Sequence, residues 1–585
     1  MNRLRLFAYD HWCKDRHSRR VNRFPQERER APAARIPLTR GNLLMSTMTA
    51  DGRVVATPQN DRLVIFASSL GTVFEWYDFY IYGTLGAILA SKFFSGVAPT
   101  SAFIFTLLAF AAGFAVRPFG ALVFGRLGDL VGRKYTFLVT MTLMGFGTFL
   151  IGVLPTYASI GIAAPILLIV LRLVQGLALG GEYGGAATYV AEHAPNGKRG
   201  LYTSWIQTTA TLGLFMALLI ILGIRTVMGE EAFNDWGWRI PFLLSVILLG
   251  VSIWIRLQLA ESPAFQKMKD EGKQSKAPLK EAFGNWANGK IAILALLGAT
   301  AGEAVVWYGG QFYALFFLTQ TIKVPAVQAQ IMIVIALALA TPGFILFGWL
   351  SDKIGRKPIM MAGFLLAVVT YFPLFQGITH FANPALEKAL AESPVTVVAD
   401  PAQCSFQLKL TGTEQYTKPC DVAKSTLVTR SVNYNNEAAA PGAPVVVKVG
   451  SDSYTAGTPD FVKNLNAAIT KHGYPASADV NQINYPMTVL LLFILVVYVT
   501  MVYGPIAAWL VELFPTRIRY TGMSLPYHIG NGWFGGFLPA TVFAIVAATG
   551  NIYSGLWYPI IIAAMSFVVA LIFLPETKDR DINKI

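Results

Sequence analysis

Two acidic residues lie three positions apart in an apolar stretch, residues 74–83, that reads FEWYDFYIYG. On a helix, Glu75 and Asp78 share one face, with Tyr82 near the same stripe. About thirteen residues separate Arg62 from Glu75, which places the acids roughly 20 Å along a helix. A carboxylate at mid-membrane depth is costly unless it faces a cavity or a partner, and burial favours its protonated form. The pair is therefore a candidate proton carrier; the alternative is two acids tolerated near an interface by snorkelling.

The next apolar stretch ends in FAVRPFG, where Arg117 precedes the helix-perturbing Pro118. An arginine inside a membrane stays charged, and its planar guanidinium can bind a carboxylate through two parallel hydrogen bonds. That carboxylate belongs either to a substrate or, in a structural ion pair, to Asp78 or Glu75. The two interpretations are compatible, because an ion pair that substrate opens would couple the two groups.

A third polar segment, RLVQGLALGGEYGGAATYVAEHAP, ends at Pro195. Arg172 and Gln175 share a helical face, and Glu182 and Tyr183 follow about 15 Å further along the helix axis. Close packing of helices explains the glycines of this segment, but it does not explain Glu182. These glycines predict a groove without side chains: Gly180, Gly181, Gly184 and Gly185.

The second half of the chain offers polar residues in three further stretches. They are Glu303, Tyr308 and Gln311 in GEAVVWYGGQFYALFF, Tyr503 and Glu512 in a later stretch, and His528 and Asn531 in PYHIGNGWFGG. A lone histidine between helices titrates near neutral pH but is more often a hydrogen-bonded core residue. We predict proton-coupling roles for Asp78, Glu75, Glu182 and Glu303. We predict substrate contacts for Arg117, Tyr82, Arg172, Gln175, Tyr308, Gln311, Tyr503 and Asn531.

A ten-residue loop occurs twice, about 220 residues apart, each time between two apolar stretches. The copies are GRLGDLVGRK at residues 125–134 and GWLSDKIGRK at residues 348–357. A repeat at this spacing in an apolar chain indicates that one membrane half-protein was duplicated. The simpler alternative is a short basic loop that turns tightly, with Gly132 and Gly355 in left-handed geometry.

The composition places all these residues in a bilayer. Mean hydropathy is +0.50, 54% of the residues are hydrophobic and 14% are charged, below the roughly 25% charged residues of soluble domains. Crossing a hydrocarbon core of about 30 Å takes about 20 helical residues. Segments of this length lie near residues 63–90, 101–124, 135–154, 162–191, 201–224, 240–259, 291–318, 327–350, 359–378, 487–513, 522–548 and 553–574.

Positive charges predict the orientation of these twelve spans. They concentrate in the loops after even-numbered spans and in the central linker. The loop residues are Arg126, Arg133, Lys134, Lys198, Arg199, Lys353, Arg356, Lys357, Arg517 and Arg519, and the linker adds Arg256, Lys267, Lys269, Lys273, Lys276, Lys280 and Lys290. Both termini are therefore predicted to be cytoplasmic, and the net charge of +14 needs no nucleic acid to explain it.

The predicted fold class is an all-α polytopic membrane protein with twelve transmembrane helices in two six-helix pseudo-repeats and a small extracytoplasmic α+β insertion. Residues 1–60 form a basic, disordered cytoplasmic tail, although a start at Met45 or Met48 would remove most of it. The N-terminal bundle is 61–259, the cytoplasmic linker 260–290, the C-terminal bundle 291–378 and 486–575, and the cytoplasmic C-terminal tail 576–585.

Residues 379–485 interrupt the second bundle between the ninth and tenth spans and are predicted to face outside. Strand-like runs at 395–399, 405–410 and 443–449 and an amphipathic helix at 459–472 indicate an α+β insertion. Cys404 and Cys420 are the only cysteines apart from Cys13 in the tail. In an oxidising compartment they predict a disulfide, whereas a zinc site lacks histidine partners.

The motifs FEWYDFYIYG, VRPFG, GRLGDLVGRK, RLVQGLALGGEYGGAATYVAEHAP and PETKDRDI together resemble the metabolite:proton symporter family of the major facilitator superfamily. The resemblance covers roughly residues 62–577 without the insertion, which departs from the family pattern. It implies two bundles that rock about a central site, with the repeated loops as latches. Asp129 would pair with helix ends of the other half, held by Arg133. The implied gating residues are Gly125, Asp129, Gly132, Arg133, Asp352, Gly355 and Arg356.

The resulting hypothesis is proton-coupled symport of a small organic acid or zwitterion across a bacterial inner membrane. Related permeases carry 2-oxoglutarate and other dicarboxylates, shikimate, proline and betaine. The alternative is a nutrient sensor that binds its ligand in the external insertion without transport. The sequence has no Gly-x-x-x-x-Gly-Lys-Ser/Thr loop for ATP and no nucleophile–base or metal-ligand constellation. We therefore predict no enzyme, cofactor or metal, and a monomer whose partners are lipid, substrate and protons.

Overall fold

The computed structural model describes residues 47–48, 54–55, 61–95, 99–257, 261–405 and 417–582. The chain divides into two compact units, Met1–Pro58 and Gln59–Ile585. In the first unit, β1 (Thr47–Met48) and β2 (Val54–Val55) pair antiparallel. The rest of the predicted tail, with Cys13 and Met45, lies outside the described residues. All the elements below belong to the second unit.

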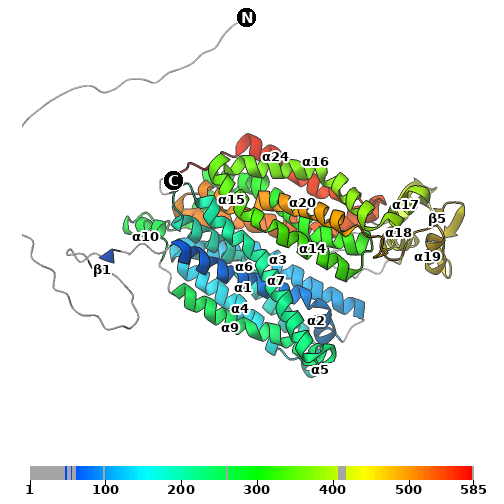
Figure 1. Cartoon of the computed structure of the whole chain (residues 1–585), viewed down its shortest axis with the longest axis horizontal. Coiled ribbons are helices and arrows are strands. Elements are labelled where there is room, and N and C mark those ends of the chain that lie inside the picture. Colours follow the sequence, from blue (N-terminus) through cyan, green and yellow to red (C-terminus); the bar gives the residue numbers. More distant parts are fainter. Residues whose placement is uncertain are drawn as a thin grey trace, which may run out of the picture. The chain divides into compact units, whose positions relative to one another are not determined.

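The first half of the second unit is a bundle of long helices, drawn from blue to teal in Figure 1. Its helices occupy the positions of the first six predicted spans. The elements are α1 (Asp61–Thr84), α2 (Gly86–Phe93), α3 (Pro99–Leu130), α4 (Arg133–Val153), α5 (Tyr157–Ile160), α6 (Ala163–His193), α7 (Arg199–Met228), α8 (Glu230–Ala232), a π-helical turn (Phe233–Gly237) and α9 (Arg239–Leu257).

A short linker with α10 (Pro263–Asp270) and a π-helical turn (Lys280–Gly284) leads into the second half. Its first membrane-length element is broken by π-helical turns at Leu296–Thr300, Gly309–Tyr313 and Phe317–Thr321. The helices are α11 (Trp286–Ala295), α12 (Ala301–Tyr308), α13 (Ala314–Phe316), α14 (Ala326–Ala340), α15 (Pro342–Ile354), α16 (Arg356–Ala382), α20 (Tyr485–Tyr503), α21 (Ile506–Leu513), α22 (Arg519–Ile529), α23 (Leu538–Thr549) and α24 (Trp557–Phe573), with further turns at Thr516–Ile518, Gly530–Gly535 and Ser554–Leu556.

Ten helical segments of the described residues are long and apolar enough to cross a membrane. The helices α1, with 24 residues, and α3, with 32, occupy the first two predicted spans. Several of their side chains lie outside the described residues, so the count of twelve spans stays a prediction. The mostly helical architecture of the predicted fold is confirmed.

The predicted insertion folds as a small unit of strands and helices between α16 and α20. Its sheet has the strand order β4-β3-β5-β6, in which only β3 and β4 are parallel. Cys404 and Cys420 form a disulfide with their Cα atoms 5.2 Å apart, whereas residues 406–410 of one predicted strand lie outside the described residues. The elements are α17 (Pro384–Glu392), β3 (Val395–Ala399), a turn (Pro401–Gln403), α18 (Pro419–Thr429), β4 (Tyr434–Ala438), β5 (Val446–Val449), β6 (Asp452–Thr455) and α19 (Phe461–Lys471).

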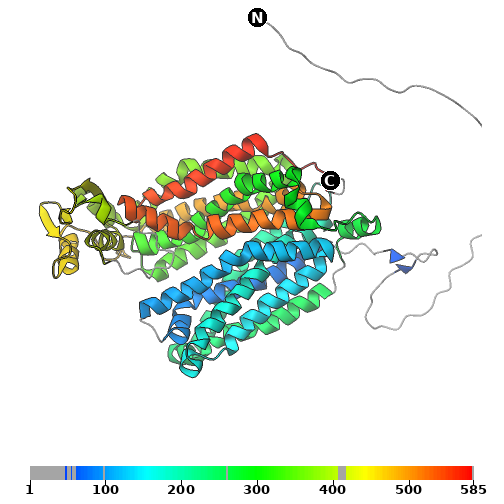
Figure 2. The same ribbon diagram turned by 180° about the vertical axis from the view of Figure 1, so that it is seen from behind.

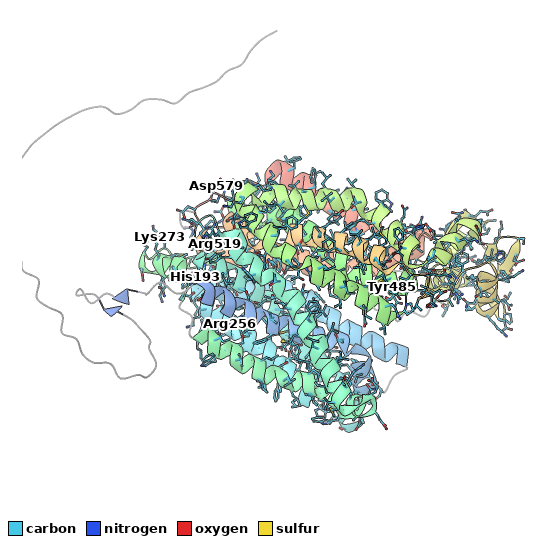
Figure 3. All side chains as sticks on the ribbon, in the orientation of Figure 1. His193, Arg256, Lys273, Tyr485, Arg519 and Asp579 are labelled. Carbon is cyan, nitrogen blue, oxygen red and sulfur yellow. A yellow bond between two sulfur atoms is a disulfide. The ribbon has the colours of Figure 1, made fainter. Side chains whose placement is uncertain are left out.

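The insertion lies at one end of the second half, and α10 lies at the opposite end, in both Figure 1 and Figure 2. We call these the insertion end and the basic end. Figure 3 places His193, Arg256, Lys273 and Arg519 at the basic end, and Tyr485 near the insertion. The insertion forms backbone hydrogen bonds with turns of the second half at the insertion end. The N–H of Tyr434 donates to the Gly550 carbonyl (2.7 Å), and the N–H of Ala478 donates to the Lys323 carbonyl (2.9 Å).

Candidate functional site

The first copy of the repeated loop bonds to the second half of the molecule at the basic end. The Asp129 carboxylate accepts hydrogen bonds from two backbone N–H groups in the first turn of α22, at 3.3 and 2.8 Å. Arg133 holds the same carboxylate through Nη1, at 3.0 Å. Glu192, at the end of α6, lies 2.8 Å from Nη1 of Arg519. We call Asp129, Arg133, Glu192 and Arg519 the first latch.

The second copy repeats this arrangement with the two halves exchanged. Asp352 accepts hydrogen bonds from two backbone N–H groups in the first turn of α7, both at 2.8 Å. Nη1 of Arg356 lies 2.6 Å from the Asp352 carboxylate. Glu512 binds Arg356 at 3.0 Å and Arg199 at 2.6 Å. We call Asp352, Arg356, Glu512 and Arg199 the second latch.

Each latch therefore ties a loop of one half to a helix N-terminus of the other. A carboxylate is a favourable partner there, because the first N–H groups of a helix lack backbone acceptors and carry partial positive charge. All eight latch side chains are 2% exposed or less. Their positions agree with the predicted contact of Asp129 with helix ends of the other half, and they correct the interpretation of Arg133, Arg199, Arg356 and Arg519 as surface charges of loops.

Two further carboxylates lie against the glycines of the repeated loop and bind the backbone N–H groups that follow them. The φ angles of Gly132 and Gly355 are 138° and 117°. Positive φ values of this kind favour glycine, which has no Cβ atom. A side chain at either position would also collide with a carboxylate, that of Glu261 or of Glu576. Glu261 accepts from the N–H of Lys134 (3.2 Å), and Glu576 accepts from the N–H groups at the start of α16 (3.0 Å).

Sequence reasoning assigned no role to either glutamate, although Glu576 lies in the motif PETKDRDI and a further signal exists. A hydroxyl residue follows each glutamate, and each hydroxyl binds the latch glutamate of its own half: Ser262 donates to Glu192, and Thr577 donates to Glu512 at 2.6 Å. The pair Glu-Ser after the sixth span and Glu-Thr after the twelfth is thus a second internal repeat.

A third charged cluster lies inside the first half. Arg256 of α9 is 2% exposed, and its Nη2 is 3.7 Å from the Glu75 carboxylate. Its guanidinium lies against the Phe137 ring, 3.3 Å from the centroid, and it also interacts with the charge of Glu182. Within the described residues, neither oxygen of Glu182 and no guanidinium nitrogen of Arg256 has a hydrogen-bond partner. We call Glu75, Glu182 and Arg256 the charge triad.

The charge triad corrects two expectations from the sequence. Arg256 is a buried partner of acids and not a surface charge of the linker. The predicted ion pair of Arg117 with Asp78 or Glu75 is wrong for this conformation, because both acids face α9: Glu75 lies beside Arg256, and Asp78 accepts a hydrogen bond of 2.5 Å from Ser245. The shared helical face of the two acids was predicted, but not the helix that this face meets.

A central cavity lies between the halves and next to the triad. It encloses about 50 Å3, room for a few water molecules and not for a metabolite. Glu75, Glu182 and Arg117 are among the residues that line it. The other lining residues are Thr72, Trp76, Phe79, Leu179, Tyr183, Trp307, Tyr308, Tyr503, Tyr527, His528 and Asn531.

Arg117 makes no ion pair with a carboxylate among the described residues. Its guanidinium carbon lies 4.2 Å from the ring centroid of Phe114 and 5.4 Å from that of Phe79, contacts in which the rings attract the charge. The side chain is 8% exposed, and Nε has no hydrogen-bond partner in the described structure. A buried, permanently charged group in this setting is suited to bind an incoming anion.

On the side of the second half, Asn531 donates a hydrogen bond of 2.9 Å to Glu303, which lies just behind the cavity lining. Tyr503 and Tyr527 share a hydrogen bond of 3.0 Å between their hydroxyls. Neither ring nitrogen of His528 has a hydrogen-bond partner among the described residues. The expectation of a hydrogen-bonded core histidine is therefore wrong in this conformation.

Four residues predicted to contact substrate do not line the cavity. Arg172 donates to Gln175 (2.9 Å), Gln175 donates to Thr148 (2.7 Å), and the Arg172 guanidinium lies 4.0 Å from the Tyr82 ring centroid. This network lies inside the first half, because Gln175 contacts α4 and Arg172 lies against Tyr82 of α1. The fourth residue, Gln311, is half-buried on a π-helical turn and also lies outside the lining.

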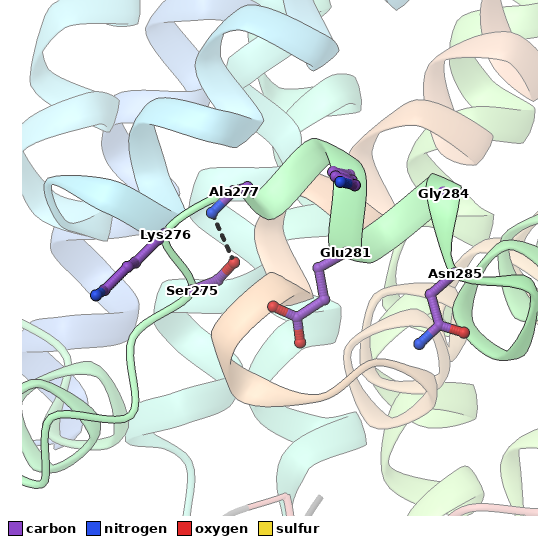
Figure 4. A pocket seen from close by; sticks show the side chains of 7 residues that line it. Ser275, Lys276, Ala277, Glu281, Gly284 and Asn285 are labelled. Atoms are coloured by element: carbon purple, nitrogen blue, oxygen red, sulfur yellow. Dashed lines mark hydrogen bonds between the residues drawn. The ribbon is translucent and has the colours of Figure 1, made fainter.

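A separate hollow of about 360 Å3 lies on the linker (Figure 4). It is lined by Ser275, Lys276, Glu281 and their neighbours, and the Ser275 hydroxyl accepts from the Ala277 N–H at 3.2 Å. None of the latch, triad or cavity residues contributes to it. Among the described residues, no group of three or more metal-ligating side chains is close enough to hold a metal ion.

Comparisons with known proteins agree with this architecture. The family described as "Sugar (and other) transporter" matches residues 63–295 and 465–585. A putative metabolite transport protein of Haemophilus influenzae is 32% identical over 536 residues, which cover 90% of this chain and 97% of the relative. The alpha-ketoglutarate permease of Escherichia coli is 36% identical over 358 residues, 60% of this chain and 81% of the relative.

A shikimate transporter of Escherichia coli is 33% identical over 338 residues, which cover 57% of this chain and 76% of the relative. Among solved structures, the proton:xylose symporter XylE superposes with a TM-score of 0.58 over 89% of this chain and 98% of its own, at 16% identity, which shows the fold alone. The resemblance to metabolite permeases that the motifs indicated is confirmed. The chain belongs to the sugar and other transporter family of the major facilitator superfamily, as an integral membrane transporter related to bacterial metabolite permeases.

Proposed function

We propose that the protein is a proton-coupled symporter that carries a small organic acid or zwitterion into the bacterial cytoplasm. The observation that carries this proposal is a mismatch of charge around one cavity. Arg117 lies there without a carboxylate partner, and two carboxylates of the charge triad share one guanidinium. The first feature suits an anionic substrate, and the second suits a proton.

Substrate binding follows from Arg117 and its surroundings. A planar guanidinium holds a carboxylate through two parallel hydrogen bonds, which gives orientation as well as energy. The hydroxyls of Tyr308, Tyr503 and Tyr527 and the amide of Asn531 line the same cavity and can bind the remaining oxygens of an organic acid. The aromatic rings of the lining suit a small carbon skeleton or an ammonium group.

Proton binding follows from the charge triad. With both acids ionised, the triad carries two negative charges and one positive charge in a buried site, where an unpaired charge is unstable. One proton on Glu75 or Glu182 removes the imbalance. The other titratable or charged groups that face the triad are Tyr189 of α6, Tyr520 of α22 and, along the cavity, Arg117 and His528.

The charges also predict how proton and substrate are coupled. Glu75, Glu182, Arg256 and Arg117 sum to zero when all are ionised, so a bound carboxylate leaves one net negative charge, which one proton cancels. Each ligand therefore favours binding of the other, as coupling requires. A dicarboxylate needs a second proton, for which the other carboxylate of the triad is the candidate. A carboxylate and its proton together carry no net charge, so the pH gradient and not the membrane potential drives their uptake.

Alternating access assigns a role to the latches. Both are closed in this conformation, and the cavity is too small for substrate. Release at the basic end requires the eight latch residues to separate as the halves rock. The concentration of Lys and Arg at this end predicts that it faces the cytoplasm, which places the insertion outside.

Uptake by purified protein in liposomes tests the proposal. Labelled 2-oxoglutarate, shikimate, proline and glycine betaine serve as probes, with and without an inward proton gradient. We expect at least one probe to accumulate only with the gradient, accumulation to be lost in Glu182→Gln, and probe binding to weaken in Arg117→Lys. Glu271→Gln, an exposed linker acid, is the matched control and should behave as the natural protein. Gradient-independent uptake would contradict proton coupling, and binding without transport would favour the sensor alternative.

A further inference from the structure

Tyr520 connects the first latch to the charge triad across the seam between the halves. Its backbone N–H donates to Asp129 of the latch, at 3.3 Å. Its hydroxyl donates to the carbonyl of Gly181, the residue before Glu182. The side chain is fully buried, and it interacts electrostatically with Glu182 and Arg256 at one end and with the latch at the other.

The Tyr520 ring occupies a slot that glycines leave open in the first half. A side-chain carbon at Gly128 of α3 would overlap the ring, one at Gly184 of α6 would lie 3.0 Å from it, and one at Gly185 would lie 2.5 Å from the hydroxyl. Two glycines of the predicted groove, Gly184 and Gly185, thus face an aromatic ring of the opposite half, whereas Gly180 and Gly181 pack closely against α3 and α4 of their own half. Because Gly128, Gly184 and Gly185 contribute no side chains to the slot, it opens when the ring leaves.

The second latch has no such ring, which shows that latching does not require one. Tyr520 follows Arg519 as Gly200 follows Arg199, and Gly128 precedes Asp129 as Ser351 precedes Asp352. The large and the small residue thus change places across the seam. In the first latch the loop has a glycine, Gly128, that faces Tyr520 of the other half; in the second the loop has Ser351, which faces Gly200 of the other half. Among the described residues, the first latch adjoins a cluster with an excess carboxylate, the charge triad, and the second latch does not.

We propose that Tyr520 is the removable plug of the proton pathway at the basic end. In the closed conformation the triad faces the cavity through Glu75 and Glu182, and the Tyr520 ring blocks the slot between the triad and the basic end. When the first latch opens, its hydrogen bond to the Tyr520 N–H breaks and the ring leaves with α22. The empty glycine slot then admits water to Glu182, which releases its proton there. This inference rests on the proposed function for the role of the triad.

A proton-leak measurement tests the plug without any substrate. Purified protein is placed in liposomes with a trapped pH-sensitive dye, and a potassium diffusion potential drives protons inward. We expect Tyr520→Ala to conduct protons several-fold faster than the natural protein, because the slot stays open while the backbone bond to Asp129 remains. Tyr520→Phe keeps the ring and should conduct protons no faster than the natural protein. If Tyr520→Ala does not fold, Tyr520→Leu gives the same expectation with a smaller increase.

Two further variants decide the route of the leak. Phe514→Ala removes a buried ring that packs against Gly522 within the second half, and it should not leak. Adding Glu182→Gln to Tyr520→Ala should return the leak to the natural level, because the proton then lacks its carrier. The proposal that Tyr520 is a plug would be overturned if Tyr520→Ala conducted protons no faster than the natural protein, or if adding Glu182→Gln left its leak unchanged. Uptake without proton coupling in the natural protein would instead overturn the proposed function, which separates the two failures.

Discussion

The latches and the charge triad are both buried clusters of acids and arginines, but they are built differently. Each latch has two carboxylates and two guanidinium groups. Five of the ion pairs in the two latches are 2.6 to 3.0 Å long, and a sixth, between Arg133 and Glu192, is 3.7 Å long. The triad has two carboxylates and one guanidinium, its one ion pair is 3.7 Å long, and both oxygens of Glu182 lack hydrogen-bond partners in the described structure. Balanced and tightly bonded charges hold two surfaces together, whereas an unbalanced, loosely bonded cluster is poised to bind a proton.

Removing a latch acid should have the largest effect on stability. Glu512 binds Arg199, Arg356 and the Thr577 hydroxyl, so Glu512→Gln leaves the buried Arg199 without an acid and Arg356 with Asp352 alone. We expect a loss of about 3 to 5 kcal/mol, the cost of breaking a buried ion pair by removing one partner. Thermal unfolding in detergent measures it, with the exposed Glu387→Gln as control. An unchanged melting temperature would mean that the latch does not hold the closed conformation.

Removing a triad acid should have the opposite pattern. Glu182→Gln takes away an unbonded carboxylate, so the melting temperature should be unchanged or higher. Accumulation of substrate in a pH gradient should be lost, because the variant lacks the carboxylate that carries the proton. Parallel melting and uptake measurements separate the two readouts. A triad variant that melts like Glu512→Gln would show that the triad is a third latch.

The difference in side chains between the two latches predicts a smaller loss of stability that a second substitution should offset. Gly128→Ser should clash with the Tyr520 ring and cost about 1 to 3 kcal/mol. Combining it with Tyr520→Gly recreates the arrangement of Ser351 and Gly200 and should recover most of the loss. A double-mutant cycle of melting temperatures measures this coupling. Additive losses would mean that the two positions do not compensate each other.

An exposed charge cluster in the insertion serves as a reference for the buried clusters, and its removal should have the smallest effect on stability. Asp452 accepts hydrogen bonds from Lys471 (3.2 Å) and His472 (3.3 Å), which hold the pKa of its carboxyl below the usual value. A carboxyl with a lowered pKa stabilises the fold above its unfolded pKa, and this contribution is lost as pH falls below about 4. Asp452→Asn should therefore lower the melting temperature slightly at pH 7 and not at pH 2. Equal effects at both values would contradict the ion pairing.

Residue types and spacing predicted the latches better than the triad. The repeated loop carries Asp129, Arg133, Asp352 and Arg356 in fixed register, so one duplicated pattern indicated both clusters. Arg256 has no such repeat, and its place just before the linker gave it the pattern of a surface charge. Hydropathy shows where a helix lies along the chain but not which helix its polar face meets. For that reason Glu75 was predicted beside Arg117 and lies beside Arg256.

The insertion shows the same limit at the level of secondary structure. The strand at Val395–Ala399 and the helix at Phe461–Lys471 were predicted, because both alternate or repeat their apolar residues. The exposed strand Tyr434–Ala438 was missed, since only its first residue is buried. Its place is decided by pairing with β3 and by contacts with the second half, which local sequence does not encode.

Infrared difference spectroscopy between pH 5 and pH 9 tests most directly the claim that the triad holds a proton and the latches do not. A protonated carboxyl group has a carbonyl stretching band that a carboxylate lacks. We predict a band that titrates in this range in the natural protein, disappears in both Glu182→Gln and Glu75→Gln, and persists in Glu512→Gln. A titrating band that survives in Glu182→Gln and Glu75→Gln but is lost in Glu303→Gln or Asp78→Asn would contradict the account and assign the proton to another acid.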